Sequence, residues 1–134
     1  MKRGQISVEY LIVIGFVVFM VLTILGVAFV YSSSLKDSIK FYQLDGYANK
    51  IISGSESVFF AGEPSRVTIT AYLPTGVKNI EVIENSIVVT ISTSSGETKT
   101  SYLSDVPISG MLGSSDGVKV VHIVAVVDGV VLSD

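Results

Sequence analysis

The chain has 134 residues, of which 49% are hydrophobic and 16% are charged, and its formal net charge at pH 7 is −3. This length suits one small domain plus a membrane segment rather than two domains. A mildly acidic chain without basic clusters is a poor binder of nucleic acid, and the absence of cysteine excludes disulfides, thiol chemistry and cysteine-ligated metals.

The most distinctive stretch of the chain is its first thirty residues. Lys2, Arg3 and Gly4 precede a short polar segment, and residues 11–30 then form an unbroken apolar run. As a helix that rises about 1.5 Å per residue, this run would span about 30 Å, the thickness of a bilayer's hydrocarbon core. Cations on the short N-terminal side predict a cytoplasmic N-terminus and an external C-terminal part.

Three interpretations of this stretch compete. A secretory signal peptide would be removed after the apolar region, and residues 26–28 loosely fit a small-x-small cleavage site. The run is, however, longer than the usual 7–15 residues of such a region. A permanent single-span anchor is the second interpretation. The third depends on the polar segment, because an ordinary signal peptide has no use for a carboxylate where its apolar run begins.

Residues 4–10, which are Gly4 and the polar segment after it, resemble the class III signal sequence of archaeal type IV pilin-like proteins. The match covers roughly residues 1–30, with residues 2 and 3 as the basic leader, and rests on Gly4, Gln5, Ser7, Glu9 and Tyr10. The resemblance implies that a prepilin peptidase recognises these residues and removes residues 1–4. The mature chain would then begin at Gln5 and keep its apolar helix.

The resemblance also implies a function. The chain would be a structural subunit of an archaeal type IV pilus-like surface filament, a helical homopolymer assembled through the apolar helix. Its partners would be other copies of itself, the prepilin peptidase, the assembly platform with its ATPase, and the membrane before assembly. Two alternatives stay open: a minor or accessory pilin, and a single-pass anchored extracellular β domain that binds a ligand or partner without polymerising. Whether such a filament serves adhesion or motility is also open.

Three residues are candidates for filament assembly. The resemblance implies that Glu9 pairs with the free amino terminus of a neighbouring subunit, unless an N-terminal Gln5 cyclises and removes that amine. The alternative for Glu9 is a carboxylate stabilised by the helix dipole. Gly15 and Gly26 lie eleven residues apart, about three helical turns, and so share a face that could permit close helix packing. Ordinary tolerance of glycine in an apolar helix is the alternative.

The helix is predicted to run over residues 5–53. Its apolar part, residues 11–30, is followed by an amphipathic part, residues 35–52, in which Phe41, Leu44, Ala48 and Ile51 recur at helical spacing. Gly54 is expected to terminate the helix as a C-cap residue.

Residues 54–134 are predicted to form a β domain, which makes the fold α+β. Period-two alternation and turn residues predict short strands packed as an antiparallel, sandwich-like domain, with residues 58–60 as a first strand and residues 105–117 as a loop. Residues 118–127 are apolar on both faces apart from Lys119 and His122, so this strand is expected to be central in the sheet or covered by the helix. His122 is expected to be structural.

No pattern in the chain indicates catalysis, a cofactor or a metal. Glu81 and Glu84 fall on opposite faces of their predicted strand, which does not suit paired acid–base chemistry. Asp105, Asp116 and Asp128 match no calcium-loop spacing. We therefore expect a non-enzymatic protein without a cofactor.

Overall fold

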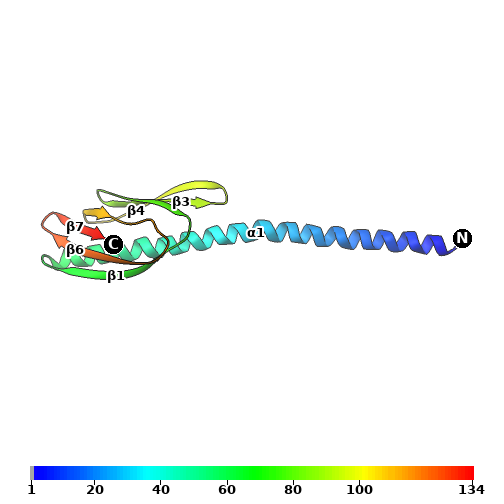
Figure 1. Ribbon diagram of the computed structural model, residues 1–134, viewed down its shortest axis with the longest axis horizontal. Coiled ribbons are helices and arrows are strands. Elements are labelled where there is room, and N and C mark those ends of the chain that lie inside the picture. The colour runs from blue at the N-terminus through cyan, green and yellow to red at the C-terminus, as the bar shows by residue number, and fades with distance from the viewer. Residues whose placement is uncertain (1) are drawn as a thin grey trace. The chain divides into compact units, whose positions relative to one another are not determined.

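The computed structural model describes the backbone of residues 2–134 and the side chains from Gly4 onward. It confirms the predicted α+β fold, in which a long N-terminal helix precedes mainly antiparallel sheets (Figure 1). The elements are α1 (Lys2–Ala61), β1 (Arg66–Leu73), β2 (Val77–Ile83), β3 (Ser86–Thr93), β4 (Gly96–Leu103), β5 (Ile108–Met111), β6 (Gly117–Val126) and β7 (Gly129–Ser133). The chain divides into two compact units, one up to Lys36 and one from Asp37 to Asp134.

The predicted end of the helix at Ser53 is wrong, because α1 continues to Ala61. Gly54 is therefore an interior residue and not a cap. A Cβ atom at Gly54 would lie 2.2 Å from the Cδ1 atom of Ile69 in β1, so the glycine allows a close approach between helix and sheet. A larger residue at this position would require the end of the Ile69 side chain to shift, so Gly54 contributes to packing and not to helix termination.

The actual C-terminal cap of α1 is Gly62. Its φ angle of +79° is left-handed, and its N–H donates to the Phe59 carbonyl oxygen at 3.1 Å. The expectation of a first strand at residues 58–60 is therefore also wrong, since these residues form the last turns of α1. Val58 is buried among the core residues, which favours one more stretch of amphipathic helix there.

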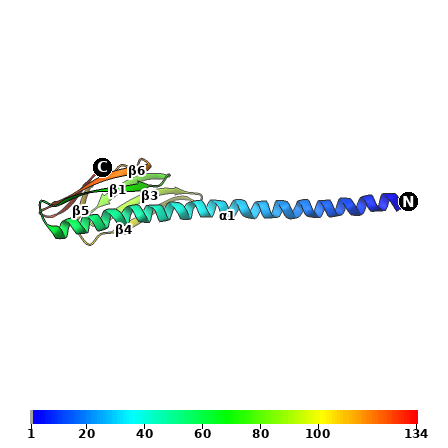
Figure 2. The same cartoon turned by 90° about the horizontal axis from the view of Figure 1, so that it is seen from below.

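Two sheets lie beside the C-terminal part of α1, as the two views in Figures 1 and 2 show. One has the strand order β1-β6-β7-β5 and the other has the order β2-β3-β4. All pairs are antiparallel except β5 with β7, in which Ile108 lies opposite Val130. The prediction of a loop over residues 105–117 is thus wrong for residues 108–111, which form a strand by pairing with β7, a strand remote in the sequence.

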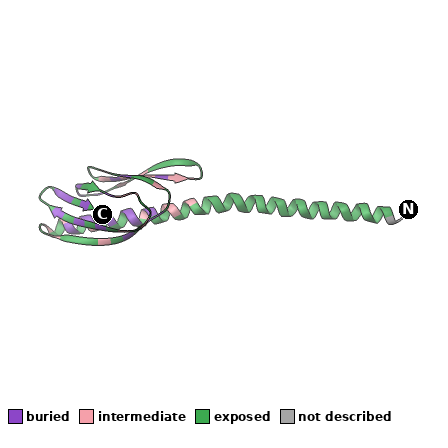
Figure 3. Ribbon diagram, in the orientation of Figure 1, coloured by how far each residue is buried: buried purple, intermediate pink, exposed green. Residues whose placement is uncertain are grey.

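The core lies between the amphipathic part of α1 and the inward faces of the strands (Figure 3). The predicted helical stripe is confirmed, because Leu44, Ala48 and Ile51 are fully buried and Phe41 packs partly buried beside them. The strands contribute alternate residues to the same core, among them Leu73, Ile87, Val89, Ile91, Val121, Ile123 and Leu132. Burial of these side chains is what joins the helix to the sheets.

The expectation that residues 118–127 form a strand that is central in the sheet or covered by the helix is confirmed, because β6 lies between β1 and β7 and one of its faces is buried in the core. Val121, Ile123 and Ala125 of β6 are buried, whereas the residues between them face outward and are exposed. His122 is on this exposed face, and its Nδ1 atom lies 3.0 Å from the Thr68 hydroxyl oxygen of the neighbouring strand. The helix covers one face of the sheet only, and the other remains open in the single chain.

Two tyrosines of the second unit present opposite hydrogen-bonding situations. The Tyr102 hydroxyl donates to the Asp45 carboxylate at 2.5 Å, and burial together with this bond raises the pKa of Tyr102 well above its ordinary value. The Tyr47 hydroxyl is buried and has no hydrogen-bond partner among the described residues. A buried donor without a partner costs stability, whereas a satisfied one contributes to it.

Phenylalanine substitutions should separate the two tyrosines. We expect Tyr102→Phe to lower the free energy of unfolding by about 1–2 kcal/mol, because it removes a bond to a charged group. Tyr47→Phe should leave that free energy unchanged or raise it by up to about 1 kcal/mol, because nothing is lost except an unpaired hydroxyl. Urea unfolding of a fragment of residues 32–134 measures both. A Tyr47→Phe cost equal to that of Tyr102→Phe would contradict this assignment.

Candidate functional site

The apolar N-terminal part of α1 is the candidate functional segment. Its large apolar side chains over residues 11–30 are all exposed in the single chain, from 42% for Ile14 to 77% for Phe29. Apolar surface on this scale is not left in water, so it requires lipid or other protein around it. Among the described residues, α1 is the one helix long and apolar enough to cross a membrane, which is compatible with membrane anchoring.

All the residues predicted for processing lie in one helical stretch. Gly4, Gln5, Ser7, Glu9 and Tyr10 belong to α1, and all five are exposed in the single chain. The structure brings none of them to a partner: among the described residues, no ion pair or side-chain hydrogen bond involves Glu9. Their accessibility is what recognition by another protein requires, and the processing and pairing roles themselves stay predictions.

Gly15 and Gly26 are likewise free of contacts in this chain. A Cβ atom at either position would meet no heavy atom within 4 Å. Nothing inside the chain therefore requires glycine there, although glycine in a helix costs about 1 kcal/mol relative to alanine. A role for these two residues in close packing would have to come from a second helix.

Within the second unit, polar contacts that the sequence did not reveal join α1 to the β3–β4 hairpin. The Asp37 carboxylate accepts hydrogen bonds from the Ser94 amide, at 3.1 Å, and from the Ser94 hydroxyl. Lys40 donates to the Ser92 carbonyl oxygen at 3.3 Å. These contacts fasten the β3–β4 hairpin to the helix, and no signal in the sequence pairs residues so far apart.

An ion pair between Lys119 and Asp134 is the other polar contact that sequence reasoning missed. The Lys119 Nζ atom lies 2.9 Å from an Asp134 carboxylate oxygen, and the two side chains are only 17% and 18% exposed. The Gly113 N–H donates to the same carboxylate at 3.0 Å. The bond from Lys119 and the Gly113 N–H hold the pKa of Asp134 below its usual range. The arrangement is structural: it joins the end of the chain to β6.

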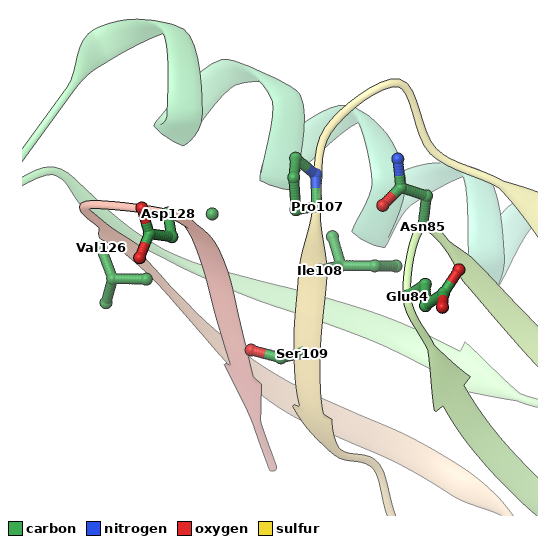
Figure 4. Close-up of a pocket in the computed structure, with 8 residues that line it drawn as sticks. Glu84, Asn85, Pro107, Ile108, Ser109, Val126 and Asp128 are labelled. Carbon is green, nitrogen blue, oxygen red and sulfur yellow. The ribbon is translucent and has the colours of Figure 1, made fainter.

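The surface of the second unit includes clefts. One cleft of about 390 Å³ lies between the β2–β3 turn, the start of β5 and the β6–β7 turn. Figure 4 shows Asp128 and Glu84 on opposite sides of Pro107 and Ile108, so the two carboxylates do not form a pair. No group of three or more metal-binding side chains occurs within the part of the chain that the structure describes.

A second cleft, of about 460 Å³, lies between β2 and residues 110–112. Its lining is mainly apolar and includes Ile80, Val82 and Leu112, together with the amide and carboxylate of Asn79 and Glu81. The Asn79 amide donates a hydrogen bond to that carboxylate at 2.8 Å. Both groups keep further donors or acceptors, so this cleft could accept part of a partner.

Comparison with known proteins does not assign the chain. No family model matches the sequence, and no curated protein or solved structure matches it significantly.

Proposed function

We propose that this protein is a pilin-like subunit of an archaeal type IV pilus-like surface filament. It would insert in the membrane with its N-terminus inside, be cut between Gly4 and Gln5, and then pass into a helical assembly of copies. The observation that supports this best is one continuous arrangement. A segment that resembles a recognition sequence for prepilin peptidase precedes an apolar stretch that is fully exposed. Both belong to α1, whose C-terminal part packs into the core of the β domain.

The energetics of such an assembly follow from the apolar stretch. Twenty exposed residues, including several Phe, Leu, Ile and Val side chains, would be buried against the same stretch of other copies. Burying one such side chain is worth about 1.5–3 kcal/mol, so the sum outweighs any single polar contact. The polar contacts would then set register: Glu9 would compensate the amino terminus of a neighbour, because an unpaired charge in an apolar bundle is costly.

The same helix fits an alternative role. A single-pass anchored β domain that binds a partner without polymerising would use the apolar stretch as a permanent membrane span. The cleft of about 460 Å³ between β2 and residues 110–112 favours this candidate, since it offers an apolar recess on the β domain. The two roles differ in the fate of residues 1–4, which an anchor would retain.

The N-terminal residue of the mature protein tests the proposal. We expect protein purified from native membranes or filaments to begin at Gln5 or at its cyclised form, as measured by mass spectrometry. Replacing Gly4 with a bulky residue such as Phe should leave the uncut precursor in the membrane, because it flanks the cleaved bond. The matched control is Gly46→Ala, at an exposed glycine in the second unit, which should be processed normally. An intact Met1, or a start near Phe29, would refute the proposal.

A further inference from the structure

The outward face of β1, β6 and β7 carries a group of exposed apolar side chains, between which lie polar residues such as His122 of β6 and Thr68 and Thr70 of β1. On β6 the outward positions include Val118, Val120, Val124 and Val126, which are 38–69% exposed. Two neighbours lie on the same face, since Tyr72 pairs with Val118 across β1 and Val131 pairs with Val124 across β7. These six residues are called the valine face: Tyr72, Val118, Val120, Val124, Val126 and Val131.

The outward face of the second sheet, β2-β3-β4, carries charged side chains, as is usual for a face exposed to solvent. They include Glu81 on β2 and both Glu97 and Lys99 on β4. Antiparallel sheets with one solvated face usually alternate in this way between apolar inward and polar outward residues. In β1, β6 and β7 the charged residues are Arg66 and Lys119, and Lys119 is bonded to Asp134. Exposure to water alone therefore does not account for the valine face.

We infer that the valine face is a contact surface for the β domain of a second copy of this chain, an inference that rests on the proposed filament. The face has no carboxylate. The charged residue on the outward side of these strands is Arg66, a cation opposite Val124. Copies of a chain with a net charge of −3 repel one another, so a surface without carboxylates is where two of them can approach. Valine and tyrosine side chains there would be removed from water at the contact.

The size of the face favours a second copy over a freely diffusing partner. Three strands about 4.8 Å apart and a ten-residue β6 make a face of roughly 15 by 30 Å, or about 450 Å². A stable complex between separate proteins buries about 800 Å² on each partner. The face is therefore too small to hold a free protein, but it suffices where apolar helices already keep copies at a high effective concentration.

Site-specific photo-crosslinking in the full-length chain tests this inference. Val120 would be replaced by the photoreactive residue p-benzoylphenylalanine, and Leu103 of β4, which is 79% exposed on the other sheet, would be the matched control. After irradiation of intact filaments we expect covalent dimers and higher multimers of this chain from position 120, at a yield at least tenfold above that from position 103. Filaments in which position 120 crosslinks no more than position 103, or crosslinks mainly to lipid or to another protein, would overturn the inference.

A charge substitution gives a second, independent readout. Val120→Lys should yield processed protein whose filaments dissociate at a lower temperature than those of Leu103→Lys, because the lysine would be trapped at the contact only at position 120. Equal dissociation temperatures would refute the valine face as a contact and leave the proposed function intact. If the unsubstituted chain forms no filaments although it is expressed and processed, the proposed function fails, and this inference fails with it.

Discussion

Glu9→Gln should reduce filament yield at least about tenfold while processing and folding of the β domain stay normal. The substitution keeps the size of the side chain and removes its charge. If Glu9 compensates the amino terminus of a neighbouring subunit, an unpaired charge would be left in an apolar bundle, at a cost of several kcal/mol for each subunit added. A carboxylate stabilised only by the helix dipole would contribute at most about 1 kcal/mol, and filament yield would then hardly change.

Mass spectrometry of the N-terminus, together with electron microscopy of shed filaments, distinguishes the outcomes for Glu9→Gln. Normal filaments from fully processed protein would end the pairing hypothesis. An uncut precursor would instead show that Glu9 is read by the peptidase. The same spectra report whether Gln5 has cyclised, in which case the terminus carries no charge for Glu9 to compensate. A conservative Glu9→Asp variant should retain part of the yield if charge is what matters.

Gly110→Ala should destabilise the β domain by about 3 kcal/mol or more. Gly110 has a φ angle of +128°, and a Cβ atom there would lie 2.0 Å from the Leu132 carbonyl oxygen. Because that oxygen belongs to the backbone of β7, it cannot move aside without separating β5 from its partner strand. Strained backbone together with a steric clash places this substitution among the most damaging single changes.

Gly96→Ala is the matched control for Gly110→Ala. Gly96 has nearly the same φ angle, +124°, but its Cβ would meet nothing within 4 Å. We expect it to cost about 1–2 kcal/mol, from backbone strain alone. Urea unfolding of residues 32–134 compares the two, and an insoluble Gly110→Ala fragment beside a folded Gly96→Ala fragment agrees with the expectation. Equal losses would mean that the contact with β7 is not as tight as the structure has it.

The candidate functional segment was identifiable from sequence because its properties are local. An apolar run of membrane length and the residues that precede it are read directly from the chain, and the structure adds that all of them are exposed. It adds no partner to Glu9, Gly15 or Gly26, because the partner that the proposal requires is another copy. The role proposed for these residues is therefore one that several copies of the chain would perform together.

Periodicity in the sequence determined the class of fold, whereas contacts between distant segments decided how the elements end and pair. Leu44, Ala48 and Ile51 were assigned to the core by helical spacing alone, since an amphipathic helix has one face to bury. Gly54 was read as a cap because glycine often ends helices, but its contact with Ile69 of β1 is invisible in the local sequence.

Tertiary structure also determines that residues 108–111 form a strand and which face of β6 is buried. Residues 108–111 resemble a loop until β7 supplies their hydrogen-bonding partners, and a four-residue strand has too few residues to show a period. The apolar residues on both faces of β6 predict a strand that is central or covered by the helix, and the structure adds that only one of the two faces is buried in the core. A group of hydrophobic side chains predicts that a surface is buried against other protein. Whether that protein is the same chain or another one depends on the tertiary and quaternary structure.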